Sequence, residues 1–280
     1  MATGRIVLKN ERDVAGLREA AAVVERVLAE AAGRIEPGVQ TVVLDRAAEE
    51  IIREAGGRPA FKGYQQSPGD DPFPGVLCIS VNDVVVHGFP STEPLQEGDV
   101  VSVDCGVELD GYFGDFAYTF PVGEVSDENA RLLEVTKQSL YDGIQRAHAG
   151  SRLGDIGHAV QSRCEGAGYG VVRDLVGHGI GQNLHEPPNV SNTGRRGFGK
   201  KLKAGLTICI EPMINRGTPD VTIDADGWTV RTADGLPSAH YEHMVLVQKG
   251  GAEILSSYAM IDAALAQKRG EPAPAEPALP

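Results

Sequence analysis

Four acidic residues interrupt runs of the sequence that are otherwise apolar. Asp104 follows the run 100–103, Asp115 lies within 112–122, Glu211 follows 207–210, and Glu242 lies within 241–245. Burying a carboxylate without a partner costs several kcal/mol, so four such burials need compensation. Divalent cations supply it, because hard oxygen ligands suit these ions and carboxylates can bridge two of them. The pattern predicts a metal site.

Two of these acids are expected to meet across a hairpin. Asp110-Gly111 separates the β-rich runs 100–109 and 112–122, and this pair is typical of a tight type I′ turn. With the turn there, Asp104 and Asp115 become near cross-strand neighbours, offset by about one residue each. Carboxylates this close repel each other unless one is protonated or cations lie between them.

Three histidines have glycine or proline residues near them, and the glycines around His178 allow close backbone approach. His178 lies within Gly177–Gly181, His185 precedes Glu186-Pro187-Pro188, and His87 directly precedes a glycine after a strand signal. A single histidine of this kind is more often structural than functional. The coincidence of three with four strand carboxylates indicates a catalytic or metal-binding site.

The histidines around Glu242 are expected to differ in role. His240 shares the face of Glu242, since alternate residues of a strand point the same way, so it could support the ligands from behind. His243 should face the opposite side.

The chain positions these residues through two similar successions of elements. Apolar residues at steps of three and four predict a helix over 11–32, and Thr41 is expected to cap a second helix through 55. Residues 65–74 are predicted to form a surface loop. Strand signals follow at 76–81, 84–87, 100–109 and 112–122.

The succession then recurs. Ser126 and Ser151 are expected to cap helices through about 149 and 167, and strands are predicted at 170–176, 206–215, 228–232 and 241–248. We expect an α+β fold in which two halves, about 10–122 and 126–250, share one curved antiparallel sheet. The prediction is a single catalytic domain over 1–265 and a disordered Pro-, Ala- and Glu-rich tail over 266–280.

Composition excludes several classes of protein. The 280 residues have a net charge of −13 and a pI near 5.0, which disfavours nucleic-acid specificity and docking on anionic membranes. No run reaches the roughly 20 apolar residues of a membrane span, and 1–11 has no apolar signal segment. The four cysteines form no CxxC pair, which predicts reduced, mostly buried thiols in a cytoplasmic protein.

The motifs around these residues resemble those of type I methionine aminopeptidases. The resemblance covers about 10–255 and rests on the segments 80–88, 104–115, 177–181, 185–188, 210–213 and 241–243. It implies the pita-bread fold of the creatinase and aminopeptidase superfamily, with helices on the outer face of the sheet.

The resemblance also implies roles for individual residues. Two metal ions would be bound by Asp104, Asp115, His178, Glu211 and Glu242, with Asp115 and Glu242 bridging. His185 would contact the substrate carbonyl, His87 the scissile amide, and Glu211 would shuttle the proton. The substrate pocket would be formed by Phe61, Tyr64, Cys78, His87, Leu184, His185 and Trp228.

Several positions depart from the family pattern. Leu184 replaces a common aromatic residue, Phe61 a tyrosine, and His240 an amide residue, while Gly106 occupies a position where a hydroxyl is frequent. The loop 65–74 is longer than in the commonest members, so it could alter access or the preferred second residue of the substrate.

The implied reaction is removal of the initiator methionine from nascent polypeptides with a small second residue. A water or hydroxide bridging two metal ions would attack the first peptide carbonyl. One imidazole and several carboxylates favour Mn²⁺, Fe²⁺ or Co²⁺, with Zn²⁺ as an alternative. We expect a monomer; ribosome association fits this activity, although no residue indicates it. Two alternatives remain open: an X-Pro aminopeptidase or dipeptidase, and a non-catalytic binding protein of the same fold.

Overall fold

The computed structural model describes residues 4–272. Its helices are α1 (Glu11–Arg34), α2 (Thr41–Glu54), α3 (Asp127–Ile144), α4 (Leu153–Gly166) and α5 (Ala259–Arg269). The strands of the first half are β1 (Arg58–Pro59), β2 (Leu77–Val81), β3 (Val84–Val86), β4 (Val100–Leu109) and β5 (Tyr112–Pro121). Those of the second half are β6 (Gly170–Val171), β7 (Gly177–Gly179), β8 (Glu186–Val190), β9 (Thr207–Ile210), β10 (Met213–Asn215), β11 (Val221–Ile223), β12 (Val230–Thr232), β13 (Ser238–His240), β14 (His243–Val247) and β15 (Ala252–Ile254).

Antiparallel pairing joins the strands, as the predicted α+β fold requires. β4 pairs with β1, β2 and β5, and a second group runs β15-β14-β9-β7-β8. Two smaller groups, β13-β10-β6 and β11-β12-β3, join strands that lie far apart in the sequence. Among the described residues, hydrogen bonding therefore divides the strands into four groups.

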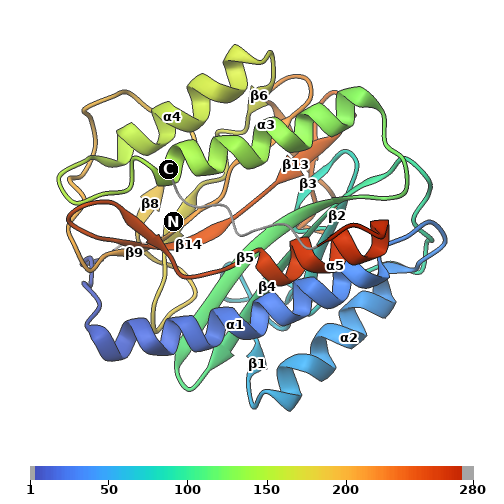
Figure 1. Cartoon of the computed structure of the whole chain (residues 1–280), viewed down its shortest axis with the longest axis horizontal. Coiled ribbons are helices and arrows are strands. Elements are labelled where there is room, and N and C mark those ends of the chain that lie inside the picture. Colours follow the sequence, from blue (N-terminus) through green and yellow to red (C-terminus); the bar gives the residue numbers. More distant parts are fainter. Residues whose placement is uncertain (1–3, 273–280) are drawn as a thin grey trace.

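The helices lie in two sets against these strands. Figure 1 shows α1, α2 and α5 together over one half of the molecule and α3 with α4 over the other. Leu17, Val24 and Leu28 of α1 join Phe116 and Phe120 of β5 in one buried cluster. Burial of these side chains, each worth about 1.5–3 kcal/mol, holds the helices on the strands.

Two helices begin with a side-chain cap, and of these the cap at Ser126 was predicted from the sequence. The Asn10 side chain accepts the Asp13 amide at the start of α1, and the Asp13 carboxylate accepts the Asn10 amide in return. Ser126 caps α3 by accepting the Asn129 amide at 3.2 Å. Such caps are each worth about 1 kcal/mol because they satisfy amides that the helix leaves free.

The predicted caps at Thr41 and Ser151 are wrong, because the hydroxyls bind elsewhere. Thr41 is the first residue of α2, and its Oγ1 accepts the Ser91 amide at 2.7 Å. Ser151 lies 2.9 Å from Nε2 of His148, and Arg152 occupies the cap position of α4. A tertiary contact therefore outcompetes the capping signal at Thr41, and a contact with a residue three positions away does so at Ser151.

Three predicted strands are shorter or interrupted. The predicted strand 206–215 divides at Glu211-Pro212 into β9 and β10, which belong to different groups. Proline has no amide to donate, so the ladder cannot continue through Pro212. The predicted strand 241–248 begins only at His243, which leaves Glu242 between β13 and β14. The predicted strand 170–176 is limited to β6.

The expected tail begins too early. Residues 266–269 belong to α5, which ends at Gly270 in the left-handed conformation (φ 68°). Ile261 and Ala266 are buried, and α5 packs along α1, so tertiary contacts support this helix. Residues 273–280 lie outside the described residues, so the prediction for them is untested.

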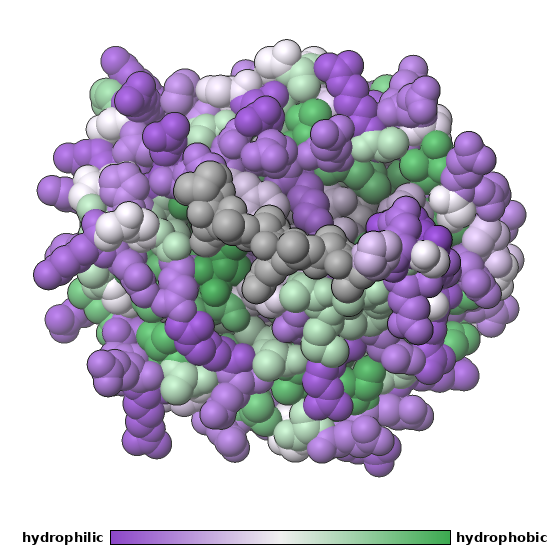
Figure 2. Space-filling model, in the orientation of Figure 1, coloured by the Kyte–Doolittle hydropathy of each residue, from purple (hydrophilic) through white to green (hydrophobic). Residues whose placement is uncertain are grey.

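The surface and the cysteines agree with what the composition predicts. On the face seen in Figure 2, hydrophilic residues predominate around smaller groups of hydrophobic ones. All four cysteines are buried and free, as predicted. Among the described helices, each is too short or too polar to cross a membrane.

Candidate metal centre

The hairpin β4-β5 places two carboxylates on one face. Asp104 lies opposite Ala117, and Asp115 lies opposite Gly106, so each acid is two positions from the partner of the other. Since the side-chain period of a strand is two, this diagonal pair points to the same side. The sequence therefore predicted their proximity correctly.

The other two carboxylates lie where strands are interrupted. β9 pairs with β14 through Ile210 and His243, and β10 pairs with β13 through Met213 and His240. Glu211 directly follows Ile210, and Glu242 directly precedes His243. The two glutamates therefore lie at adjacent breaks in the two neighbouring ladders. An interrupted ladder frees the backbone to turn, so both side chains can point into the space that β4 and β5 face.

His178 of β7 completes the cluster. Its Nε2 lies 3.6 Å from Oδ2 of Asp115 and 3.6 Å from Oε1 of Glu211. Its Nδ1 lies 2.9 Å from the Gly179 carbonyl oxygen, which orients the ring with Nε2 toward the acids. Burial lowers the pKa of His178 to about 3, so the imidazole is neutral and has a lone pair for a cation.

These residues line one cavity of about 690 Å³ together with every other site residue predicted from the sequence. The cavity is lined by the acids Asp104, Asp115, Glu211 and Glu242, the histidines His87, His178 and His185, and the predicted pocket residues Phe61, Tyr64, Cys78, Leu184 and Trp228. Asp115 and Glu242 are buried, whereas Asp104 and Glu211 are partly exposed.

The acids have more negative charge than the protein around them neutralises. Oδ1 of Asp104, Oδ1 of Asp115 and Oε1 of Glu242 are buried without a hydrogen-bond partner. Burial raises the pKa of Asp104 to about 7. Burial, and then the neighbouring carboxylates, raise the pKa values of Asp115, Glu211 and Glu242 well above the usual range. Such a set binds protons or cations, and the unpartnered oxygens with one imidazole fit divalent ions.

Cys209 is a member of this cluster that the sequence did not reveal. Single ligand atoms of Asp115, His178, Cys209 and Glu242 lie within 4.8 Å of one another. Burial, followed by the nearby Glu242 carboxylate, raises the pKa of the Cys209 thiol well above its usual value, so it stays protonated. The available signal was its position two residues before Glu211 in the predicted strand 206–215.

The two remaining predicted histidines, His185 and His87, also line the cavity. The His185 ring centroid is 4.5 Å from that of His178, and desolvation lowers the pKa of His185. His87 adopts a positive φ of 60°, which is rare for a non-glycine residue and typical of functional sites. Burial, and then the charge of His185, lower the pKa of His87 to about 4.

An aromatic cluster forms the apolar part of the cavity. Cys78 and Trp228 pack with Phe73, which the sequence analysis assigned to a surface loop. Phe73 is instead 2% exposed, and its ring centroid lies 5.3 Å from that of Trp228. The Trp228 Nε1–H donates to the Asp71 carbonyl oxygen at 2.9 Å, so a hydrogen bond also connects the loop 65–74 to the aromatic cluster. The signal for Phe73 was one aromatic residue within a loop rich in Gly, Pro and Asp.

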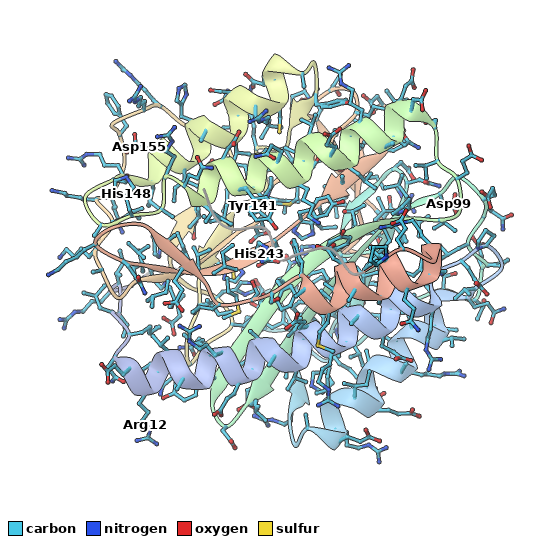
Figure 3. All side chains as sticks on the ribbon, in the orientation of Figure 1. Arg12, Asp99, Tyr141, His148, Asp155 and His243 are labelled. Carbon is cyan, nitrogen blue, oxygen red and sulfur yellow. The ribbon has the colours of Figure 1, made fainter. Side chains whose placement is uncertain are left out.

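His240 and His243 face opposite ways, as the alternation predicted. His240 lines the cavity. Nδ1 of His243 lies 2.8 Å from the Ser256 hydroxyl, and its ring centroid lies 5.8 Å from that of Tyr141 of α3. Figure 3 shows His243 close to Tyr141, on the side of the strands that the helices cover.

The chain is similar to known metallopeptidases in both sequence and structure. The model of metallopeptidase family M24 matches residues 15–249. A methionine aminopeptidase of Clostridium perfringens is 47% identical over 251 residues, which are 90% of this chain and 98% of that protein. The crystal structure of a methionine aminopeptidase from Thermotoga maritima superimposes with a TM-score of 0.86 at 38% identity, over 90% of this chain and all of that one.

A more distant structure shares the fold alone. A prolidase from Pyrococcus furiosus has a TM-score of 0.71 at 21% identity, over 90% of this chain and 65% of that one. These superpositions confirm the pita-bread fold predicted from the motifs.

Proposed function

The chain belongs to metallopeptidase family M24, and from this membership we propose that it removes the initiator methionine from new polypeptides by metal-dependent hydrolysis. The observation that best supports the proposal is the convergence of Asp104, Asp115, His178, Glu211 and Glu242 on one cavity beside an aromatic pocket. A charged cluster alone would suit many metal sites. Its position next to an apolar pocket suits a substrate with an apolar first side chain.

Two divalent ions would be held by the five converging residues, with Asp115 and Glu242 as the candidates to contact both. Asp115 has close neighbours on both sides, with Asp104 across the hairpin and His178 at 3.6 Å. When bound, such ions supply Lewis acidity and a water molecule whose pKa is lowered toward neutrality. Several carboxylates and one imidazole suit Mn²⁺, Fe²⁺ or Co²⁺, with Zn²⁺ as an alternative.

The protein's own groups then orient the substrate and transfer the proton. His185 lies next to His178 at the cavity, where it can donate a hydrogen bond to the first peptide carbonyl oxygen and stabilise the negative charge that develops there. Glu211 can accept a proton from the attacking water and pass it to the departing amine. His87, whose ring centroid lies 6.0 Å from that of Trp228, is placed to contact the scissile amide.

The pocket formed by Phe61, Tyr64, Phe73, Cys78 and Trp228 is assigned to the methionine side chain. A thioether packs favourably against aromatic rings, which are the main lining here. We expect a small second residue in the substrate, as the resemblance to type I methionine aminopeptidases implies.

The experiment that tests this proposal compares two classes of peptide. Metal-free protein is reconstituted separately with Mn²⁺, Fe²⁺, Co²⁺ and Zn²⁺, and the bound metal is measured. We expect cleavage of Met-Gly and Met-Ala peptides and none of Ala-Pro peptides. Cleavage of Ala-Pro peptides alone would assign the chain to X-Pro hydrolysis. No cleavage of either class by fully metallated protein would favour a binding protein.

A further inference from the structure

We propose that Nε2 of His240 is a ligand of the metal centre, so that the centre has two imidazole ligands and not one. This inference rests on the proposed function only in requiring that the cavity binds divalent ions. It adds a nitrogen to the five residues assigned above, and it predicts which metals the centre prefers.

The backbone of His240 is held firmly in place. Its amide donates to Oγ1 of Thr119 at 2.9 Å, and that hydroxyl donates to the His240 carbonyl oxygen at 2.6 Å. His240 also pairs with Met213 at the end of β13. The residue is 2% exposed, so its ring has little freedom to move toward solvent.

The Nε2 atom nevertheless has no partner in the protein. It is buried, and it neither accepts nor donates a hydrogen bond among the described residues. A buried polar atom without a partner costs about 1–3 kcal/mol, so such atoms in native proteins need an explanation. His243, three positions along, shows the contrast, since its Nδ1 lies 2.8 Å from the Ser256 hydroxyl.

The distances from Nε2 are those expected between ligands of one ion. Nε2 of His240 lies 3.9 Å from Oε2 of Glu211 and 3.9 Å from Oε2 of Glu242. These separations are too long for hydrogen bonds. Nitrogen and oxygen ligands lie about 2.0–2.2 Å from ions such as Zn²⁺, so two ligands of one ion are at most about 4.4 Å apart.

His178 meets the same test from the other side. Its Nε2 lies 3.6 Å from Oε1 of Glu211, whereas His240 approaches Oε2 of the same carboxylate. The two imidazoles therefore flank Glu211, and both can reach an ion that this carboxylate binds. Since imidazole suits Fe, Co and Zn ions better than the oxygen-preferring Mn²⁺, a second imidazole shifts the selectivity toward the former.

The decisive experiment counts imidazole ligands directly. The full-length protein is loaded with Co²⁺, and the hyperfine-shifted, exchangeable imidazole N–H protons are recorded by paramagnetic NMR in H₂O and D₂O. We expect two such signals in the unmodified protein, one in His240→Gln and two in His243→Gln. The matched control removes a buried histidine three residues away that faces the helices and not the cavity.

A competition experiment gives a second readout. Zn²⁺ is titrated against Mn²⁺ in the unmodified protein and in His240→Gln, with bound metal measured after dialysis. Loss of a ligand should weaken Zn²⁺ binding relative to Mn²⁺ by about 10- to 100-fold, as outer contacts to metal sites already have effects of this size. Proportionate weakening of both ions would indicate a positioning role and contradict ligation.

The outcomes separate this inference from the proposed function. A single imidazole signal in Co²⁺-loaded unmodified protein overturns the inference and leaves the metallopeptidase assignment intact. Failure of the unmodified protein to bind Co²⁺ or any other divalent ion would instead overturn the proposed function. Because the unmodified protein alone gives the signal count, the test holds even if His240→Gln does not fold.

Discussion

The phenol oxygen of Tyr64 lies 3.0 Å from Nδ1 of His185. Desolvation raises the pKa of Tyr64, which keeps the phenol protonated, and lowers the pKa of His185, which keeps the imidazole neutral. The phenol then donates to Nδ1, and the ring proton is held on Nε2. A residue of the substrate pocket thus fixes the tautomer in which His185 can donate a hydrogen bond to the substrate.

Removal of this phenol tests the relationship. Tyr64→Phe keeps the aromatic ring and loses one hydrogen bond, worth about 0.5–1.5 kcal/mol. We expect kcat/KM for a Met-Ala peptide to fall about 3- to 10-fold with unchanged bound metal. The measurement is steady-state kinetics beside metal analysis. If kcat/KM fell only because KM rose, with kcat unchanged, Tyr64 would only pack against the substrate.

Substitutions of His185 and Asp115 should separate catalysis from metal binding. His185→Ala removes a hydrogen-bond donor to the developing negative charge, so kcat should fall about 10²- to 10³-fold while metal content is retained. Asp115→Ala should instead lose metal, since Asp115 lies at the centre of the carboxylate cluster. Both are measured by kinetics and by bound metal per protein. Full activity in His185→Ala would disprove the role assigned to it.

The carboxylate cluster predicts how stability depends on pH without metal. Burial raises the pKa of Asp104 to about 7, and it raises the pKa values of Asp115, Glu211 and Glu242 well above their usual range. Between about pH 4 and 7 these carboxylates therefore bind more protons in the folded protein than in the unfolded chain, where their pKa values are near 4. The stability that they contribute should be lost as the pH rises through about 7.

Metal should reverse this trend. Bound ions keep the carboxylates ionised, and their affinity rises with pH. The histidines act in the opposite direction up to about pH 7, because their lowered pKa values keep them neutral in the fold while the unfolded chain still binds protons on them. Comparing the protein with and without metal at each pH separates the carboxylate effect from theirs. The check is a series of thermal unfolding curves with and without Mn²⁺. A metal-induced rise in Tm that is the same at pH 6.5 and 8.5 would refute the linkage.

An ion pair next to the site should matter for stability. The Lys9 ammonium lies 2.5 Å from Glu186, and the two side chains are only 4% and 10% exposed. The other Glu186 oxygen accepts the Gln182 amide at 3.0 Å. Lys9→Met leaves a buried charge without its partner, which should lower the free energy of unfolding by about 3 kcal/mol.

Neutralising the remaining charge provides the control. The double variant Lys9→Met, Glu186→Gln should recover part of the stability, because the uncompensated charge is gone. Urea unfolding at constant pH measures both variants. Because Glu186 follows His185 directly, the single variant should also lose activity. Unchanged stability in Lys9→Met would mean that solvent replaces the ammonium.

Phe73, from the loop 65–74, should limit the length of the first side chain that the pocket accepts. Phe73→Ala removes a buried ring that packs against Trp228, so the pocket should accept first side chains longer than methionine. We expect the ratio of kcat/KM for such substrates to that for methionine to rise about 10-fold, since contacts of one or two methylenes are worth about 1–3 kcal/mol.

Phe89 offers a matched control for this substitution. Its ring centroid lies 5.3 Å from that of Phe73, but it does not line the cavity. Phe89→Ala should therefore lower stability without altering the substrate ratio. If both variants changed the ratio equally, the effect would come from loosening of the whole aromatic cluster.

The sequence by itself determined the chemical identity of the site and much of the architecture. Acids at Asp104, Asp115, Glu211 and Glu242 stand out because a charge in an apolar run is costly wherever the strand lies. The Asp110-Gly111 turn set the register of β4 and β5, since a two-residue hairpin leaves one pairing. Both signals lie within short stretches of the sequence, so they can be recognised without knowledge of the fold.

Only the tertiary structure decided how distant segments meet. The break at Glu211, the burial of Phe73 and the helix α5 depend on surfaces supplied by other parts of the chain. The unpartnered Nε2 of His240 and the contact between Tyr64 and His185 depend on distances between strands and loops far apart in sequence. Periodicity assigns a side chain to a face, but which atoms it meets there follows from how the elements pack.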